Sequence, residues 1–468
     1  MTRAPAPAPA AREEALPVRV KAGFALGDHS INLQLSSLSL FFLFFLTEVA
    51  GLPPVQAGLV LLVGRAADAF TDPLMGRLSD LTPWRWGRRR PYFLLGALPF
   101  GATTALLWST PVETPDGAKF AWYAAIYVCN TLASTTLAVP YMALLPELAT
   151  DYDERTSLNT YRAVGAISAT MAIAVGLRPL VEWLGGGPSA WEQAGLALGL
   201  CVALPWLLVY RVTWERPDLR QPSSVRFLAG ARLAARNRAY RHLVGLFLSA
   251  RIAVDVVGAM FLFYFTYWIG RPEDFPITLG LMLTADVLSL PIWMRIARRF
   301  DKRAIFVVGS LWWIGAQAAL FAVGPEHPRA LIFAIATLAG VGYAVADLMP
   351  WSMLGDVIDA DELYTGERRD GLYAGFFTFL RKLGGATGVA LAGLLLQLAG
   401  FEAGRPQSDT AVLTIRLLTG VLPALFLIVA IAVALGYPLS LSRHREIAER
   451  LAARRADRRR EPTLGRAP

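Results

Sequence analysis

The chain has 468 residues, of which 55% are hydrophobic and 17% are charged, and its mean hydropathy is +0.44. Soluble proteins carry about 25% charged residues, so this composition argues against a water-soluble protein and favours a membrane protein. The net charge of +9 arises from arginines and lysines in short segments between apolar runs, as in membrane proteins. No nucleic-acid-binding motif accompanies this charge, so we expect no nucleic-acid partner. Cys129 and Cys201 form neither a metal-ligand spacing nor a disulfide framework.

The N-terminal residues 1–21 are polar and rich in proline and alanine. They lack the apolar stretch and cleavage site of a signal peptide, and we expect a disordered cytoplasmic tail. Apolar segments then recur at about the 20 residues that a helix needs to cross a membrane. Six of these segments precede a polar stretch, at 22–48, 54–79, 91–110, 119–147, 160–184 and 194–213.

The polar stretch at 214–240 is predicted to be a cytoplasmic linker. From Val225 to Tyr240 arginines are interleaved with apolar residues, as in a helix that lies on a membrane surface. Six further apolar segments follow, at 242–269, 277–297, 304–323, 329–356, 371–399 and 411–437. We therefore predict an all-α membrane protein with twelve transmembrane helices in two six-helix bundles, residues 22–213 and 241–438, followed by a basic cytoplasmic tail, 439–468.

Positive charge gathers on one side of this predicted topology. Basic residues follow the second span at Arg88–Arg90, the eighth at Arg295–Arg303 and the tenth at Arg368–Arg369, and they crowd the tail from Arg443 onward. The loops on the other side carry few of them. Because cytoplasmic loops are enriched in Lys and Arg, we expect both termini to be cytoplasmic and the protein to be a multi-pass protein of the cell (inner) membrane.

Two carboxylates inside the second span are the clearest candidates for chemistry. Asp68 and Asp72 are four residues apart, so a helix places them on one face. Adjacent carboxylates repel unless a cation or a proton neutralises them, and their hard oxygens suit Na⁺ or H⁺. The alternative is a structural pair that is neutralised by Arg65 or by another helix. We expect a coupling ion, Na⁺ or H⁺, and no resident cofactor.

Other polar residues lie in the first, fifth and tenth spans. Asp28 and Asn32 share one helix face and are candidates for binding a substrate, unless they are simply wetted at the cytoplasmic mouth. His29 is also a candidate, although a lone histidine is often a hydrogen-bonded structural residue. Arg162 can extend to the membrane surface or face a cavity. Trp351 follows a proline and is a cavity candidate, with core packing as the alternative.

The second half of the chain carries its own ionisable residues. Arg251 and Asp255 are four residues apart and can neutralise each other. Asp286 and Asp347 are isolated. Arg381–Lys382 lie inside the eleventh span, where a cation can answer the carboxylate pair across a cavity. No nucleophile, metal or phosphate-loop constellation is present, so we do not expect an enzyme.

Several motifs together resemble the glycoside–pentoside–hexuronide cation symporters, the melibiose-permease branch of the major facilitator superfamily. They are Gly64-Arg65-x-x-Asp68-Ala69-x-x-Asp72-Pro73-Leu74-Met75-Gly76, then Trp86-Gly87-Arg88-Arg89-Arg90-Pro91-Tyr92, and Asp356-Val357-Ile358-Asp359 through Glu362-Leu363 to Gly371. These motifs fall in both halves of the chain. The resemblance implies a twelve-helix fold, alternating access and a small-molecule substrate.

The resemblance also implies roles for individual residues. Asp68 and Asp72 would bind the coupling cation, and Thr135 would supply another oxygen of that site. Arg162 would bind the sugar, and Lys382, or its neighbour Arg381, would link the cation and substrate sites. The residues expected to act in coupling or gating are Arg65, Arg77, Asp80, Arg88, Arg381 and Lys382. Of the basic turn after the second span, Arg77, Asp80 and Arg88–Arg90 would form cytoplasmic contacts that stabilise the outward-open state.

The chain departs from the family at positions that contact the sugar. Ala138 stands where the melibiose permease has an aspartate, Met142 stands where an aromatic residue is expected, and His29 aligns with a sugar-binding aspartate while Asp28 is displaced by one. We expect a monomeric cation-coupled symporter of a sugar or glycoside in contact with membrane lipid. The alternatives are a symporter of a lysolipid or of another amphiphile or anion, a proton-antiport drug exporter, and a non-transporting receptor or scaffold.

Overall fold

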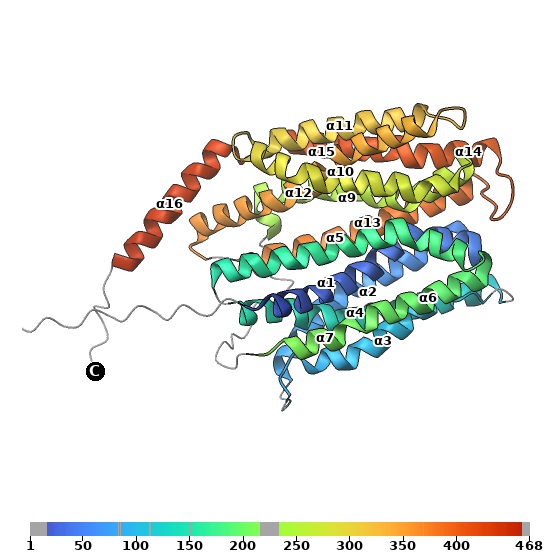
Figure 1. The fold of residues 1–468 in the computed structure, drawn as a ribbon. Coiled ribbons are helices and arrows are strands. Elements are labelled where there is room, and N and C mark those ends of the chain that lie inside the picture. The colour runs from blue at the N-terminus through green and yellow to red at the C-terminus, as the bar shows by residue number, and fades with distance from the viewer. Residues whose placement is uncertain are drawn as a thin grey trace, which may run out of the picture.

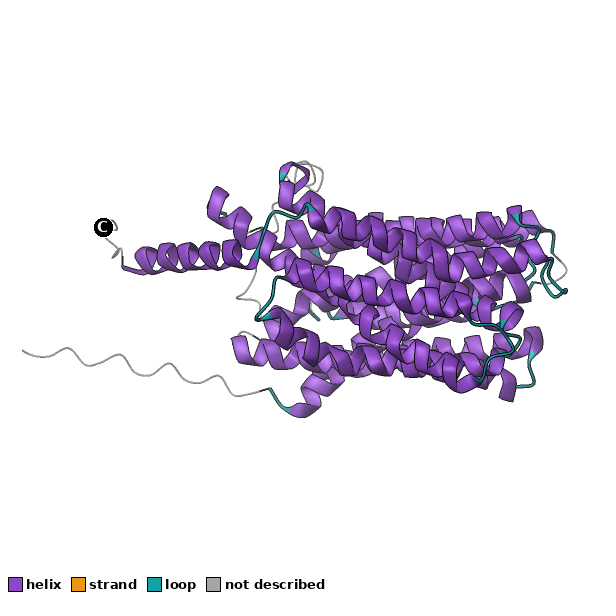
Figure 2. Ribbon diagram, turned by 90° about the horizontal axis from the view of Figure 1, so that it is seen from above, coloured by secondary structure: helices purple, strands orange, loops and turns teal. Residues whose placement is uncertain are grey.

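The computed structural model describes residues 16–460 except 83, 85, 112–113, 150, 216–233 and 368. All regular elements among these residues are helices, as Figure 2 shows. This agrees with a chain that lies in lipid, because a helix satisfies all of its backbone hydrogen bonds internally. The prediction of an all-α membrane protein is confirmed.

The first half consists of α1 (Val18–Ser37), η1 (Leu38–Phe42), η2 (Phe45–Val49), α2 (Pro54–Leu81), α3 (Pro91–Leu107), α4 (Asp116–Leu148), α5 (Tyr152–Trp183), α6 (Gly187–Ala203) and α7 (Pro205–Val212). The second half consists of α9 (Arg238–Phe263), η4 (Tyr264–Trp268), η5 (Pro272–Asp274), α10 (Phe275–Ala297), α11 (Lys302–Ala322), α12 (Arg329–Thr365), α13 (Asp370–Leu398), α14 (Asp409–Arg416), η6 (Leu417–Val421), α15 (Leu422–Leu435) and α16 (Leu441–Arg460).

The helices run side by side in two groups, as Figure 1 shows. Helices α1 to α7 form one group and α9 to α15 the other, and the groups meet where α2 packs against α13 and α5 packs against α10. The start of α1 and the whole of α16 lie at the same end of the molecule. That end is called here the α1 end, and the other is called the far end.

Nine helical segments of the described chain are long and apolar enough to cross a membrane. Helix α3 is apolar but shorter. Helices α1 and α2 do not combine the length and the apolar composition of those nine segments. In α2 this follows from Arg65, Asp68, Asp72 and Arg77, which interrupt its apolar surface. The number of twelve crossings therefore stays a prediction, although helices occupy all of the predicted ranges.

Two predicted boundaries at the α1 end need correction. Helix α1 begins at Val18, after Pro17, so the last residues of the predicted tail are helical, and Lys21 forms an ion pair with Glu154 of α5 at 2.9 Å. Helix α5 begins at Tyr152, eight residues before the predicted span, because the Asp151 carboxylate accepts hydrogen bonds from two backbone amides of the first turn.

Two predicted cytoplasmic segments are described in part. The basic tail contains α16, in which Ile447 and Leu451 pack against Ala360 of α12. The linker prediction and its amphipathic helix fall mainly on residues outside the described ones, and α9 already begins at Arg238. The proposed tail 1–21 is likewise described only from residue 16.

The far end of the molecule is sealed where α2 meets α13. A Cβ atom added to Gly58 would lie 2.8 Å from Ala390 Cα, and one added to Gly393 would lie 2.3 Å from the Pro54 carbonyl oxygen. Glycine lets two helices approach this closely. Phe44 of the first half and Phe263 of the second add an edge-to-face ring contact at 5.2 Å. These contacts close the interior from the far end.

Candidate functional site

The carboxylate pair lies at the junction of three helices. Helix α2 presents Asp68 and Asp72 on one face, towards α4 and α13. The Lys382 ammonium of α13 lies 2.6 Å from Asp68 Oδ2 and 2.7 Å from Asp72 Oδ2. The hydroxyl of Thr135 in α4 lies 3.2 Å from Asp68 Oδ1 and 3.0 Å from Asp72 Oδ1. Asp68, Asp72, Thr135 and Lys382, which were predicted to form or adjoin one cation site, thus lie together in the structure.

The Lys382 ammonium neutralises part of the charge that the two carboxylates share. It lies between them, where a coupling cation held by the same oxygens would bind. Arg65, the partner considered first from the sequence, instead donates a hydrogen bond to the Ser39 hydroxyl at 3.2 Å. The pair is therefore held by another helix, and that helix belongs to the other half of the chain. A cation can bind all four oxygens only after Lys382 moves.

A cavity of about 710 Å³ adjoins this cluster. Its wall comes from α1, η1, α2, α4 and α13 and runs from Leu38 of η1, inside the molecule, to Gly371 in the first turn of α13. The cavity therefore reaches the α1 end. Most of its wall is apolar, and Ala138 and Met142 belong to it.

Gln34 and Asn130 are among the polar residues of the wall that were not predicted as site residues. The Gln34 side-chain amide donates a hydrogen bond to Asn130 Oδ1 at 2.6 Å, and Asn130 in turn donates to Thr104 at 2.9 Å. Both Gln34 and Asn130 line the large cavity. An amide side chain in an otherwise apolar span was the available signal for Asn130.

Asp28 and Arg162 form an ion pair within the first half. Arg162 Nε lies 2.5 Å from Asp28 Oδ2, and its Nη2 lies 3.2 Å from Asp28 Oδ1. The Tyr141 hydroxyl donates a second hydrogen bond to Asp28 Oδ2 at 2.7 Å. Asp28 of α1 and Arg162 of α5, which were both predicted to bind substrate, thus bind each other. Neither belongs to the wall of the large cavity.

The neighbours of Asp28 in α1 have different surroundings. His29 Nδ1 lies 3.0 Å from the Ser168 hydroxyl and 3.2 Å from the Gly165 carbonyl oxygen on α5. This is the hydrogen-bonded structural setting considered as the alternative. The Asn32 amide donates to the Asp28 carbonyl oxygen at 2.8 Å and also lines a smaller cavity.

Trp351 packs among aromatic rings of the second half. Its ring centre lies 5.1 Å from that of Phe377 and 5.9 Å from that of Phe247. Trp351 lines neither the large cavity nor this smaller one. Its substrate-binding role stays a prediction, and its geometry is that of the packing alternative.

The smaller cavity, of about 270 Å³, lies between α1 and α5 of the first half and α9, α10, α12 and α13 of the second. Arg251 forms a two-armed ion pair with Asp255, in which Nε lies 3.0 Å from Oδ2, and its Nη1 lies 3.4 Å from Asp347. Arg381 lines both this cavity and the large one. The predicted neutralisation between Arg251 and Asp255 is present.

The family described as "MFS/sugar transport protein" has a model that matches residues 23–440 of the chain. The chain belongs to this family. It is 31% identical to the inner membrane symporter YicJ of Escherichia coli, over 94% of this chain and 96% of that one. It is 27% identical to the isoprimeverose transporter of Lactiplantibacillus pentosus, over 88% and 86%. It is 28% identical to the sodium-dependent lysophosphatidylcholine symporter 1-A of Danio rerio, over 92% and 88%.

A solved structure shares the fold of this MFS protein. It is a bacterial homologue of the human lysosomal transporter Spinster, with a TM-score of 0.68 over 93% of this chain and 99% of that one, at 11% identity. The predicted family, the glycoside–pentoside–hexuronide cation symporters of the major facilitator superfamily, is confirmed. The protein is a multi-pass membrane symporter for a cation and not an enzyme.

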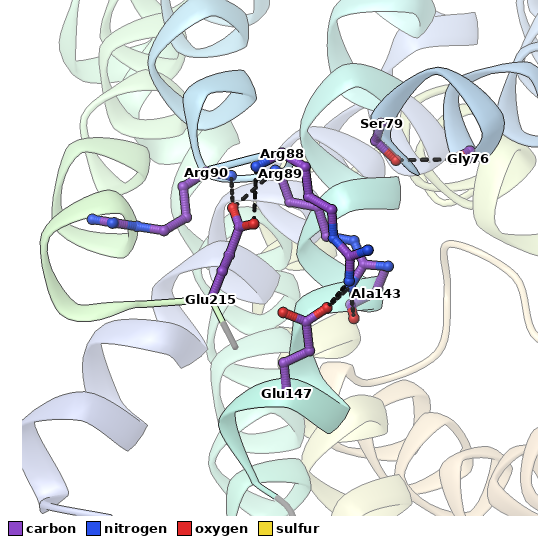
Figure 3. Close-up of polar contacts among 8 residues, drawn as sticks. All are labelled: Gly76, Ser79, Arg88, Arg89, Arg90, Ala143, Glu147 and Glu215. Carbon is purple, nitrogen blue, oxygen red and sulfur yellow. Dashed lines mark hydrogen bonds and ion pairs between the residues drawn. The ribbon is translucent and has the colours of Figure 1, made fainter. Parts of the chain in front are cut away.

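The basic turn before α3 is held by Glu147 of α4 and by Glu215, which follows α7, as Figure 3 shows. Arg88 and Arg89 form ion pairs with Glu147 of α4, at 2.5 Å for Arg89. The Glu215 carboxylate accepts hydrogen bonds of 2.9 Å from the backbone amides of Arg88, Arg89 and Arg90. Glu147 and Glu215 were not predicted, since nothing in their local sequence links them to residues so far away.

The gating prediction for this region stays a prediction. Arg77 is exposed on α2, and the side chain of Asp80 lies outside the described residues. Arg88 forms its ion pair with Glu147, which lies in the same half of the chain.

Proposed function

We propose that the protein couples the downhill entry of Na⁺ or H⁺, bound at Asp68 and Asp72, to the uptake of a sugar or glycoside by alternating access. The observation that carries this proposal is the Lys382 ammonium between two carboxylates beside a large cavity. A protein cation already occupies the site, so an external cation must compete with it. The isoprimeverose transporter among the relatives supports a sugar-like cargo.

The exchange of Lys382 for an external cation supplies a coupling mechanism. When Na⁺ or H⁺ neutralises the pair, Lys382 leaves it and its ammonium becomes available to the cavity. Cargo that binds the released ammonium stabilises the cation-bound state, and the cation stabilises cargo binding by the same free energy. Thr135 would complete the cation site with a hydroxyl oxygen.

The structure corresponds to an inward-facing state in this proposal. Its basis is the charge of the loops, which places the α1 end and both termini in the cytoplasm. The large cavity reaches that end, while the far end is closed by α2 and α13. The inner-membrane symporter among the relatives supports the same membrane for this chain.

A second candidate cargo is a lysolipid or a related amphiphile. The apolar wall that includes Ala138 and Met142 favours it, as does the lysophosphatidylcholine symporter among the relatives. The cation site would be the same in both cases.

The test is uptake by the full-length chain in proteoliposomes, with an imposed Na⁺ or pH gradient and a panel of sugars, glycosides and lysolipids. We expect accumulation of one cargo class by the native protein, and none with Asp68→Asn or Asp72→Asn. Asp116→Asn at the start of α4 is the matched control, since Asp116 is exposed and outside the cavities. Cation-dependent uptake that survives in both cavity variants would refute the proposal.

A further inference from the structure

Among the cations of the described part of the two cavities, Arg381 differs because no carboxylate lies close enough to it to form an ion pair or a hydrogen bond. Its Nε is buried without a hydrogen-bond acceptor, and among the described residues Arg381 makes no hydrogen bond and no ion pair. Lys382 pairs with Asp68 and Asp72, Arg251 with Asp255, and Arg65 donates to Ser39. Asp347 and Asp255 act on this guanidinium only from a distance. A buried charge without a hydrogen-bonded counter-ion is costly, so Arg381 is suited to bind an anionic group.

The position of Arg381 shows where that group would bind. Arg381 lines the large cavity, the smaller cavity and a third space of about 40 Å³ beside them. It is adjacent to Lys382 in α13. Its guanidinium therefore stands at the junction of the cavities, where cargo in the large cavity can reach it. A planar guanidinium binds a carboxylate or a phosphate with two parallel hydrogen bonds.

The charges that line these spaces give a second, independent indication. Among the described lining residues, the acids are Asp68, Asp72, Asp255 and Asp347, and the bases are Arg65, Arg251, Arg381 and Lys382. The two sets are equal, so the lining is neutral before any coupling ion binds. One Na⁺ or H⁺ at the carboxylate pair adds one positive charge and releases Lys382. In a medium of low dielectric constant that excess charge favours an anion.

We propose that the cargo is a monoanion, whose carboxylate or phosphate-type group binds Arg381 together with the Lys382 ammonium that the coupling ion releases. This rests on the proposed cation symport and names the cargo class of that same site. The remainder of the cargo lies in the large cavity, against Ala138 and Met142. Cargo and one coupling ion then cross as a neutral pair.

Binding to the purified full-length chain in nanodiscs with saturating Na⁺, at a fixed pH, tests the cargo class. Two matched pairs of probes serve, each a neutral compound and a monoanion built on it: methyl glucoside with methyl glucuronide, and a monoacylglycerol with its methyl phosphodiester. We expect the anionic member of one pair to bind at least about tenfold more tightly than its neutral partner. The pair that responds tells a sugar acid from a lipid phosphate. Binding of neutral probes as tight as that of the anions, or no binding of either anion, would overturn the proposal.

Variants of Arg381 test the assignment to this residue. In Arg381→Gln the affinities for the anionic and the neutral probe should differ by no more than about threefold. Arg381→Lys should restore part of the preference for the anion, because lysine keeps the positive charge but cannot form two parallel hydrogen bonds. Arg178→Gln is the control, since Arg178 lies on α5 beside Glu182 and outside the cavities. An anion preference that persists in Arg381→Gln would overturn the assignment.

The response to membrane potential separates this inference from the proposed function. Proteoliposomes that accumulate the responding anion should do so at the same rate with and without an imposed potential, since a neutral pair moves no net charge. Uptake that the potential accelerates, or cation-driven uptake of a neutral sugar, would refute the anionic cargo while leaving cation coupling intact. Uptake without any cation dependence would refute the coupling itself.

Discussion

Lys382 and Arg162 both neutralise aspartates inside the helical bundle, but they join different parts of the chain. Lys382 of α13 reaches Asp68 and Asp72 of α2, so its ion pairs connect the two halves. Arg162 of α5 reaches Asp28 of α1, so its ion pair stays within one half. A motion that turns one half against the other must change the first contact and can leave the second intact.

This difference indicates which ion pair a coupling cation controls. A cation at Asp68 and Asp72 competes for oxygens that also connect α2 with α13, so its binding removes one connection between the halves. The Asp28–Arg162 pair, which Tyr141 also contacts, instead stiffens the contact of α1 with α5. The predictions below are ordered by expected effect and test this contrast.

Lys382→Gln should have the largest effect on transport. It removes the internal competitor, so we expect the affinity of the pair for Na⁺ or H⁺ to rise by about tenfold or more, which corresponds to about 1.4 kcal/mol. Cation-driven accumulation should nevertheless fall to background, because binding no longer alters a connection between the halves. Calorimetric Na⁺ titration, proton titration and proteoliposome uptake measure the two effects. Unchanged cation affinity would show that Lys382 does not compete for the site.

Arg162→Ala should affect stability more than cation binding. It leaves the Asp28 carboxylate with Tyr141 alone, and removing one member of a buried ion pair costs about 3 kcal/mol. We expect a lower melting temperature and weaker cargo binding, with cation affinity unchanged. The double variant Arg162→Gln with Asp28→Asn should recover most of the stability. A loss of cation affinity as large as the gain in Lys382→Gln would remove the contrast between the two ion pairs.

The sequence predicted the part of the site that lies within one helix. Asp68 and Asp72 stood out because they are one helical turn apart in an apolar run, and the family motif indicated Thr135 and Lys382. Periodicity could not show that Lys382 contacts a carboxylate 310 residues earlier. That contact depends on how the two halves meet, and local sequence does not encode it.

The same reasoning explains which fold features were missed. The helical ranges followed from apolar length, and Pro17 and the Asp151 cap decided ends that hydropathy alone placed elsewhere. Asp28 and Arg162 were both selected as substrate ligands because each is an ionisable residue in a span. Their mutual pairing, across 134 residues, could be seen only once α1 and α5 lay together.

Gly393→Leu should have the next effect, because it acts on the contact that seals the far end. The added side chain meets the Pro54 carbonyl oxygen, and overpacking of this kind costs about 1–3 kcal/mol. The state open at the far end should become about tenfold more populated. The measurement is labelling of Leu38→Cys by an impermeant thiol reagent from the far side, in a parent protein whose Cys129 and Cys201 are replaced by serine. Gly176→Leu, which has open space around its Cα, should label like the parent, and equal labelling of both variants would contradict the seal.

Thr135→Val is expected to have the smallest effect and to identify the coupling ion. The substitution keeps the shape of the side chain but removes the hydroxyl near both carboxylates. Na⁺ needs several oxygen ligands, so its affinity should fall by about fivefold, or about 1 kcal/mol, and Thr135→Ser should restore it. A proton needs only one carboxylate oxygen and should bind almost as before. Comparison of Na⁺-driven and pH-driven uptake in these variants therefore identifies the coupling ion. A loss in Thr135→Val that is confined to Na⁺-driven uptake would show that Thr135 is a Na⁺ ligand. Equal uptake rates in both variants would show that the carboxylates bind a proton without help from Thr135.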